Sequence, residues 1–245
     1  MPQIKTWLRT LRRSTWAAPF FAPYYRWRVR ADLKNHSCPS DQFLESALGL
    51  IHVGAHFGEE RMDYAKMNLA VLWIEADPRI VPKLRANLRG FSKQICLQAL
   101  LGDRAQEACD FYIANNEGAS SSLYPLDQAH LIWPELKMGE KLSLPKYTLP
   151  QALLQAGLSM SDFDTLILDV QGAEMEILKG IPQIQKYFKR IQLETSNFAV
   201  YQGVPLKEEI DQYLFERGYE VVGSKIFAAY GKKQCMDSRY ILAEP

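Results

Sequence analysis

The sequence contains few cysteines and no long apolar run, and these two absences exclude several classes of protein. Its four cysteines, Cys38, Cys96, Cys109 and Cys235, lie far apart and form no C-x-x-C pair, so neither a disulfide framework nor a zinc site is expected. We predict four reduced thiols, as is typical of a cytoplasmic protein, with Cys96 and Cys109 in the core. No run of about 18 apolar residues is present to span a bilayer as a helix, and the N-terminal region lacks the order of a secretory signal.

Charge is balanced over the whole chain but not along it. The 29 Lys and Arg residues against 28 Asp and Glu residues give a net charge of +1, which does not suit a protein that coats nucleic acid. Residues 1–34 nevertheless hold eight basic side chains and one acidic one, interleaved with aromatic residues. This segment could dock on an anionic membrane surface, pack on the acidic remainder of the protein, or form a contact in a homo-oligomer. We favour the second and third interpretations.

From residue 48 onward, strands and helices alternate. The expected strands are residues 48–53, 71–74, 94–101, 165–170, 190–193, 219–222 and 239–242. The expected helices are residues 59–69, 79–88, 173–179 and 206–217. This alternation predicts an α/β fold, with a mostly parallel seven-stranded sheet and helices on both faces.

The chain is expected to form one domain over residues 48–245, preceded by an N-terminal extension over residues 1–47. Residues 104–162 break the alternation of strands and helices with asparagines, serines and prolines. A loop of this length inside a domain is usually functional or carries small elements of its own. We interpret it as an insertion over the carboxyl edge of the sheet.

The first motif is a strand, turn and helix around Gly54. Gly54 and Gly58 end the strand and open the helix, so that a ligand can approach the backbone. Glu75 ends the next strand about 20 residues later, where a carboxylate can accept both hydroxyls of a ribose. His56 stands where a dinucleotide fingerprint needs glycine, and Glu59 brings negative charge to the position of a pyrophosphate. The pattern therefore favours S-adenosyl-L-methionine over NAD.

The second motif follows the expected strand 165–170. Asp169 stands at the carboxyl end of this strand, on the edge where ligands bind in open α/β sheets. It could position the amino-acid tail of the cofactor, orient the acceptor, or cap the following helix. Glu194 ends the next strand on the same edge. Glu174 stands in the first turn of a helix, where the helix dipole favours an acid, so a purely structural role is equally open for it.

Four motifs in this order resemble the FkbM family of methyltransferases. They are Val53-Gly54-Ala55-His56-x-Gly58-Glu59, Ile74-Glu75-x-Asp77-Pro78, Asn116-x-Gly118-Ala119-Ser120-Ser121-Ser122 and Asp169-Val170-Gln171-Gly172-Ala173-Glu174-x-x-x-Leu178-Lys179-Gly180. With Tyr201-x-Gly203-x-Pro205 and Gly218-Tyr219, the resemblance spans residues 48–223. It implies a Rossmann-like class I methyltransferase with S-adenosyl-L-methionine as donor and an O-linked acceptor on a sugar or small natural product.

The resemblance also implies roles for individual residues. The cofactor-binding set would comprise Gly54, Ala55, His56, Gly58, Glu75, Ala76, Asp103 and Asp169. Of these, Glu75 would bind the ribose, Asp103 would lie near the adenine, and Asp169 near the transferred methyl. The acceptor side would comprise Ser120, Ser121, Ser122 and His130. The chain departs from many family members at His52, Ile167 and Gln171, where those members carry Asp, Lys and Glu.

Methyl transfer needs a nucleophile in line with an activated methyl and a group that removes its proton. Placement alone can supply about 7–11 kcal/mol, whereas a positioned base adds about 10²–10⁴ in rate. The base candidates are His56, His130, Asp169 and Glu194. We expect no metal, because no set of ligand residues has a recognisable spacing.

Two alternatives remain open. A nucleotide-dependent oxidoreductase would need cations near the turn to bind phosphate, and only Arg61 lies there. The other alternative is a module of the same fold that binds the cofactor but does not catalyse methyl transfer.

Overall fold

The computed structural model describes residues 43–243. The predicted basic segment 1–34, most of the predicted N-terminal extension and Cys38 lie outside this range. Residues 47–245 form one unit, which contains the elements described below. Within the described range, no helix is long and apolar enough to cross a membrane.

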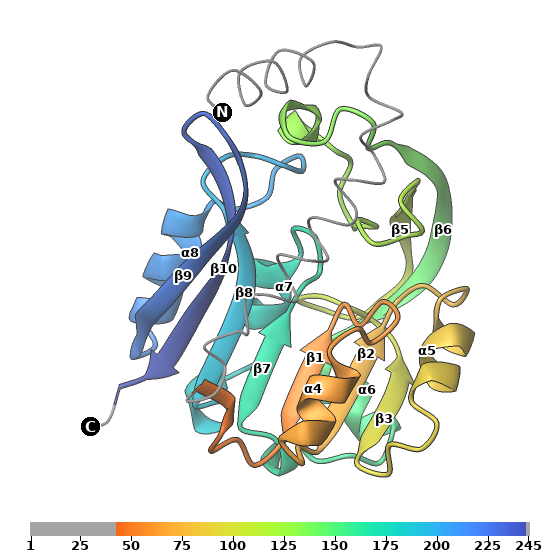
Figure 1. The fold of residues 1–245 in the computed structure, drawn as a ribbon, viewed down its shortest axis with the longest axis vertical. Coiled ribbons are helices and arrows are strands. Elements are labelled where there is room, and N and C mark those ends of the chain that lie inside the picture. Colours follow the sequence, from red (N-terminus) through yellow and green to blue (C-terminus); the bar gives the residue numbers. More distant parts are fainter. Residues whose placement is uncertain (1–42, 244–245) are drawn as a thin grey trace, which may run out of the picture. The chain divides into compact units, whose positions relative to one another are not determined.

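A seven-stranded sheet organises this unit, in the order β3-β2-β1-β7-β8-β10-β9 (Figure 1). Its strands are β1 (Leu50–Val53), β2 (Val71–Glu75), β3 (Gln94–Gln98), β7 (Thr165–Leu168), β8 (Arg190–Ser196), β9 (Tyr219–Tyr230) and β10 (Lys233–Leu242). The first five strands in the spatial order are parallel, and β10 runs antiparallel to both of its neighbours. The predicted α/β fold with a mostly parallel sheet is confirmed.

Within residues 43–243, α-helices cover both faces of this sheet (Figure 1). They are α4 (Arg61–Lys66), α5 (Val81–Asn87), α6 (Leu149–Gln155), α7 (Glu174–Lys179) and α8 (Lys207–Phe215). Apolar residues of α6, α7 and α8, such as Leu153 and Leu178, share one core with the alternate strand residues Ile51 and Leu166. On the opposite face, His52 and Trp73 pack with Tyr64 of α4. The central strands are buried on both sides, which explains why they read as continuous apolar runs.

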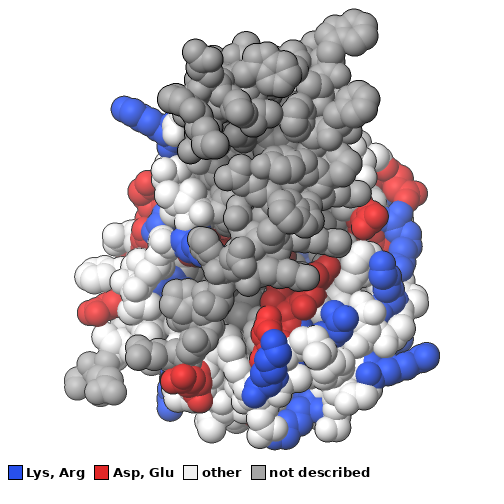
Figure 2. Space-filling view, viewed as in Figure 1, with Lys and Arg blue, Asp and Glu red and all other residues white. Residues whose placement is uncertain are grey.

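The surfaces beside α4 and α5 differ in charge. Figure 2 shows Lys and Arg side chains over the side of the molecule where α5 lies, with Asp and Glu side chains beside α4. Lys83 and Arg85 of α5 are exposed, as are Glu59 and Asp63 at the start of α4. The turn that precedes α4 is therefore flanked by negative charge.

The predicted strand 94–101 is wrong as a single element. The chain leaves the large sheet after β3, and Leu100–Leu101 forms a separate strand, β4. The switch occurs at Ala99, whose amide donates to the carbonyl of Glu75 at 3.0 Å. The apolar residues continue through the switch, from the partly exposed β3 to the buried β4, so the hydrophobic pattern alone does not mark the break.

The insertion 104–162 is largely a second sheet rather than a loop. β5 (Gln106–Ala114) and β6 (Met138–Tyr147) pair antiparallel, and β4 adds to β6 in the order β4-β6-β5. Helix α6 then leads back to the large sheet. The segment between β5 and β6, residues 115–137, contains the predicted asparagines and serines.

The C-terminal strands are longer than predicted. β9 and β10 form a hairpin of 12 and 10 residues, in which β9 is the edge strand. Gly223-Ser224-Lys225 interrupts the apolar pattern of β9, and two register shifts bend the pair. A strand prediction based on alternating apolar and polar residues ends at such positions, although the backbone pairing of the two strands continues.

Helix α4 is shorter than the predicted helix 59–69. It ends at Lys66, and Asn68 adopts a left-handed backbone conformation with φ of 58°. Cys96 and Cys109, predicted to be core residues, are only half-buried, whereas Cys235 is buried, and all three are free thiols. β3 and β5, which carry the first two, are partly exposed strands.

A buried lysine joins the small sheet to α7. Lys146 of β6 contacts Glu176 at 3.0 Å and Asp103 at 3.5 Å, and its side chain is 5% exposed. Tyr124 donates its hydroxyl to the same Glu176. Burial and this bond raise the pKa of Tyr124. The two carboxylates depend on Lys146 for compensation of their charge.

Replacing Lys146 with methionine is expected to lower the free energy of unfolding by about 2–3 kcal/mol, because the aliphatic stem is preserved while two carboxylates lose their cation. Lys141→Met is the matched control, since Lys141 pairs with Asp110 on the same strand pair but both side chains are about half exposed. Such surface pairs contribute little. Urea unfolding of both variants measures the difference, and equal losses would contradict the role given to Lys146.

Candidate functional site

A cavity opens at the carboxyl ends of β1, β2 and β7, between the large sheet and the insertion. Its apolar walls include Val53, Ile74, Ala76, Leu100, Leu101, Phe111 and Leu123. Its polar lining includes His56, Glu75, Ser121, Asp169 and Gln171. Among the described residues that line it, none is Lys or Arg. The cavity thus brings the two sequence motifs together and adds walls from β4 and β5.

Gly54 allows the tips of β1 and β7 to meet. Its φ is +81°, and a Cβ atom at this position would lie 1.7 Å from the carbonyl oxygen of Asp169. The amide of Gly54 donates to the carbonyl of Ile74, and the amide of Asp169 donates to that of Val53. Only glycine combines this backbone conformation with such close backbone contact. The turn therefore holds Asp169 beside the first motif.

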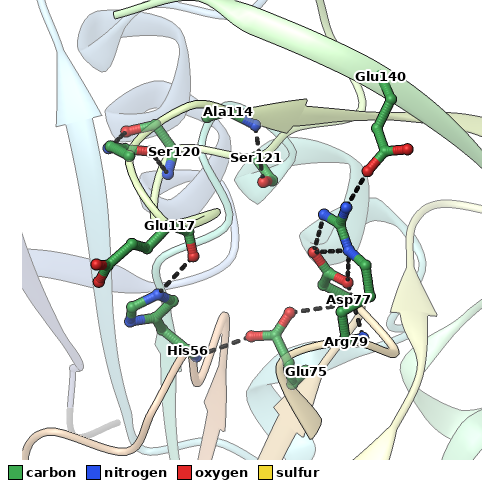
Figure 3. Close-up of polar contacts among 10 residues, drawn as sticks. His56, Glu75, Asp77, Arg79, Ala114, Glu117, Ser120, Ser121 and Glu140 are labelled. Carbon is green, nitrogen blue, oxygen red and sulfur yellow. Dashed lines mark hydrogen bonds and ion pairs between the residues drawn. The ribbon is translucent and has the colours of Figure 1, made fainter.

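Glu75 is fixed by two backbone amides at the end of β2. Its carboxylate oxygens accept hydrogen bonds from the amide of His56 and the amide of Asp77, each at 2.8 Å (Figure 3). Burial raises the pKa of Glu75, while both amide bonds act in the opposite direction by stabilising the carboxylate. The side chain is 7% exposed and lines the cavity. Its oxygens retain acceptor capacity toward a ligand with paired hydroxyls.

His56 connects the turn to the insertion. Its Nε2 lies 3.2 Å from the carbonyl oxygen of Glu117 and its Nδ1 lies 3.1 Å from a carboxylate oxygen of Glu59; Figure 3 shows the contact with Glu117. Because both partners are acceptors, the doubly protonated ring satisfies both contacts. Burial opposes this charge, but the bonds to Glu59 and Glu117 outweigh it and raise the pKa of His56. Action of His56 as a base would require one of these contacts to break.

The three serines predicted to bind the acceptor hold the segment after β5 in place. Ser120 exchanges two hydrogen bonds with the side chain of Asn116, and Ser121 accepts from the amide of Ala114 (Figure 3). Ser122 donates to the carbonyl of Gln171 at 2.6 Å. Of the three, only Ser121 lines the cavity. Within the protein, the hydroxyl of Ser122 thus donates, whereas those of Ser120 and Ser121 accept.

An arginine ties the end of β2 to the small sheet. Arg79 donates to both carboxylate oxygens of Asp77 and reaches Glu140 of β6 (Figure 3). Asp77 is 1% exposed. The pair fixes the chain directly after the wall residue Ala76. Arg79 is engaged by carboxylates and does not line the cavity.

At another part of the cavity wall, Asp169 and Gln171 meet Glu194 of β8 and Tyr201 of the loop after β8, which line a second hollow. The side-chain amide nitrogen of Gln171 lies 2.7 Å from a carboxylate oxygen of Asp169 and 2.7 Å from one of Glu194. Its amide oxygen accepts from the hydroxyl of Tyr201 at 2.6 Å. Burial, and next the negative charge of Asp169, raise the pKa of Glu194 well above its usual value.

Glu174 has a structural role beside this part of the cavity wall. It is 4% exposed and accepts hydrogen bonds from the amides of Val170 and Gly172. Burial raises its pKa to about 7, although the amides favour the carboxylate. Both amides belong to the turn between β7 and α7. Glu174 therefore stabilises the turn that presents Asp169 and Gln171.

Three further residues singled out in the sequence lie away from the cavity. Asp103, predicted near the adenine, pairs with Lys146 and is absent from the cavity lining. His130, predicted on the acceptor side, is exposed, and its ring contacts the carbonyl of Asp127. His52 bonds the hydroxyl of Tyr64 and stacks on Trp73 on the α4 face of the sheet.

Two residues gain importance only in the structure. Tyr201 stood in a quoted motif without a role, and Gln171 stood only as a departure from the family pattern. No local signal pairs them, because they are 30 positions apart. Within the described range, no cluster of His, Cys, Asp and Glu is arranged to hold a metal ion.

Comparison with protein families gives a match that covers more than half of the chain. A family model described as "Methyltransferase FkbM domain" matches residues 52–221. No curated protein matches the chain by sequence.

Solved structures are similar to the chain at low identity. The magnesium protoporphyrin IX methyltransferase ChlM of Synechocystis PCC 6803, crystallised with SAH, is 10% identical, with 89% of this chain and 84% of that chain covered and a TM-score of 0.47. Sp1610 of Streptococcus pneumoniae, a tRNA (m1A22) methyltransferase by its description, is 10% identical, with coverage of 83% and 72% and a TM-score of 0.47. The glycopeptide N-methyltransferase MtfA is 8% identical, with coverage of 89% and 90% and a TM-score of 0.43.

Proposed function

The chain belongs to the FkbM methyltransferase family, and from this we propose that its cavity holds the methyl donor S-adenosyl-L-methionine. The enzyme, a Rossmann-like class I methyltransferase, then methylates a hydroxyl of a sugar or small natural product. The observation that carries the site assignment is the cavity at the strand tips. It combines a fixed carboxylate at Glu75, apolar walls, and acidic groups, with no Lys or Arg among the described residues of its lining.

The residues of the cavity suit the parts of the donor. Glu75, oriented by two backbone amides, would accept the ribose hydroxyls. Leu100, Leu101 and Phe111 offer apolar surface to the adenine. Asp169, in the polar lining, would face the positively charged part of the donor. The donor supplies a methyl group that is already activated on a sulfonium.

The remaining chemistry belongs to the chain. The turn at Gly54 and the tip of β7 fix where the donor lies, so that an acceptor oxygen can approach in line. Asp169 lines the cavity and Glu194 is joined to it through the side chain of Gln171, and either could accept the proton of the acceptor hydroxyl. Burial and the charge of Asp169 raise the pKa of Glu194, and a carboxylate with a raised pKa is the stronger base once ionised.

The oxidoreductase alternative is less consistent with the same cavity. A dinucleotide pyrophosphate needs cations or free amides at the turn. Arg61, the cation noted in the sequence, donates to the carbonyl of Gly58 and does not line the cavity. Glu59 instead brings a carboxylate to the turn.

Titration calorimetry with S-adenosylhomocysteine is expected to show saturable binding with one site per chain, because this product carries the adenine and ribose that the cavity is proposed to hold. NADH is the matched control, since it carries the same adenosine joined to a pyrophosphate. Absence of saturable binding by S-adenosylhomocysteine would overturn the proposed cofactor site, and tighter binding of NADH would favour the oxidoreductase.

The acceptor is identified by product analysis. Incubation with donor labelled in the methyl group and an extract of host-cell metabolites is expected to yield a labelled, O-methylated glycoside or natural product by mass spectrometry. A label found on nitrogen or carbon would overturn the hydroxyl assignment while leaving the cofactor site intact.

A further inference from the structure

Gln171 occupies an unusual position between two carboxylates. It lies in the turn after β7 with φ of 57°, a conformation that costs energy for a residue other than glycine. Its amide nitrogen bonds Asp169 and Glu194, and its amide oxygen accepts from Tyr201. The carbonyl of Gln171 accepts from Ser122 of the insertion. Every polar group of the side chain is thus committed, and the side chain cannot rotate without breaking three hydrogen bonds.

The surroundings of this pair are mainly acidic. Several ionisable groups interact electrostatically with Glu194 or with the acidic groups around it. They are Asp169 at the tip of β7, Glu174 of α7, Asp237 and Cys235 of β10, Tyr201 of the loop after β8, and Glu60 before α4. Lys225 of β9 and Arg239 of β10 act on Asp237. The two N–H groups of Gln171 are neutral donors to both carboxyl groups, which also share a direct hydrogen bond.

Gln171 also stands between two hollows of the surface. It lines the cofactor cavity together with Asp169, and it lines a second hollow together with Glu194 and Tyr201. A change in the hydrogen bonds of Gln171 would therefore affect both the donor in the cavity and a molecule bound in the second hollow beside Glu194.

We propose that Gln171 is a positioning residue whose side-chain amide sets the charge of the Asp169–Glu194 pair, and that this pair makes the site prefer the cationic donor to the neutral product. The inference rests on the proposed function, because it takes the cavity to hold S-adenosyl-L-methionine. It concerns a property that methyl transfer itself changes: the donor carries a positive sulfonium, and the product S-adenosylhomocysteine carries a neutral thioether.

The direction of the effect follows from electrostatics. A negative pair stabilises the sulfonium and gives nothing comparable to the thioether, so loss of the methyl weakens binding and favours release of the product. At low pH Glu194 is protonated and the pair carries less charge. As pH rises, Glu194 ionises and the preference for the donor increases. The N–H groups of Gln171 stabilise the ionised form, so their removal moves this change to higher pH.

The test is the ratio of the dissociation constants of S-adenosylhomocysteine and S-adenosyl-L-methionine, measured by calorimetry between pH 5 and 9. In the unaltered protein the ratio is expected to rise about tenfold as Glu194 ionises, because one further charge then appears near the sulfonium. Glu194→Gln is expected to abolish this rise. The same variant shows how much of the pH dependence comes from titration of the amino-acid tails of the two ligands.

Gln171→Met keeps the length of the side chain but not its N–H groups, and it is expected to move the midpoint of the rise upward by about one pH unit. Tyr201→Phe, which removes one hydrogen bond to Gln171 and no carboxylate contact, is expected to move it in the same direction by less. Gln212→Met is the matched control, because Gln212 is an exposed glutamine whose amide bonds the single carboxylate of Glu216 on α8. It should leave the profile unchanged.

The outcomes separate the two proposals. Failure of both ligands to bind would overturn the proposed function. Binding of both with a ratio that does not depend on pH, or with a profile unchanged by Glu194→Gln, would overturn the role of the pair alone. An unchanged midpoint in Gln171→Met and Tyr201→Phe would overturn the role of Gln171, and if Gln171→Met does not fold, Tyr201→Phe decides.

Discussion

Replacing Gly54 with alanine is expected to lower the free energy of unfolding by about 4 kcal/mol or more, which is exceptional for the addition of one methyl group. Two costs add at this position. The left-handed conformation, with φ of +81°, costs about 1–2 kcal/mol for a residue with a Cβ atom. The new methyl would also lie 1.7 Å from the carbonyl oxygen of Asp169, so the tips of β1 and β7 must separate. Denaturant unfolding measures the loss.

Gly157→Ala isolates the first of these costs. Gly157 follows α6 with a similar φ of +70°, but a Cβ atom there would meet nothing within 4 Å. Its replacement should therefore cost only the conformational part, about 1–2 kcal/mol. If both variants lost the same stability, the close approach of β1 and β7 would not be what requires glycine at position 54. Donor binding by any folded Gly54→Ala protein should be weaker too, since Asp169 moves.

Replacing Glu75 with alanine is expected to weaken binding of S-adenosylhomocysteine by about 10- to 100-fold, because a hydrogen bond to a charged group contributes about 1.5–3 kcal/mol. Folding should suffer as well. The amides of His56 and Asp77 lose their acceptor, and each buried amide left without one costs about 1–3 kcal/mol. Calorimetry measures the first effect and urea unfolding the second.

Glu75→Gln distinguishes the two roles of this side chain. The amide keeps the shape and one acceptor oxygen, so it can still bond one of the two backbone amides. We expect stability closer to that of the unaltered protein, together with weaker ligand binding, since the charge is lost. A folded Glu75→Ala protein with unchanged affinity for the product would show that Glu75 shapes the turn and does not contact the ribose.

The sequence predicted the framework of the site well, for a physical reason. Gly54, Glu75 and Asp169 each stand at the end of an apolar run, and parallel strands present their carboxyl ends on one edge. Strand ends are local features, so periodicity and a following glycine or proline are enough to locate them. Glu174 was predicted with two roles left open, and its bonds to the amides of Val170 and Gly172 give it the structural one.

Predictions that depended on neighbours distant in sequence did less well. The split of residues 94–101 depends on the bond from Ala99 to Glu75, which no local pattern reveals. His56 was predicted in the cofactor loop and as a candidate base, but its contact with the carbonyl of Glu117, 61 positions away, depends on where the insertion lies. The serine run looked like a binding surface, yet Ser122 is occupied by the carbonyl of Gln171.

The order of apolar and polar residues by itself determined a parallel α/β sheet with glycine turns and carboxylates at the strand tips, because each of these follows from steric and hydrophobic preferences within a few residues. Only the tertiary structure decided how those carboxylates are paired, which of them the insertion covers, and that Gln171 joins two of them. Hydrogen bonds between side chains require specific distances and directions across separate elements, and the packing of those elements sets both.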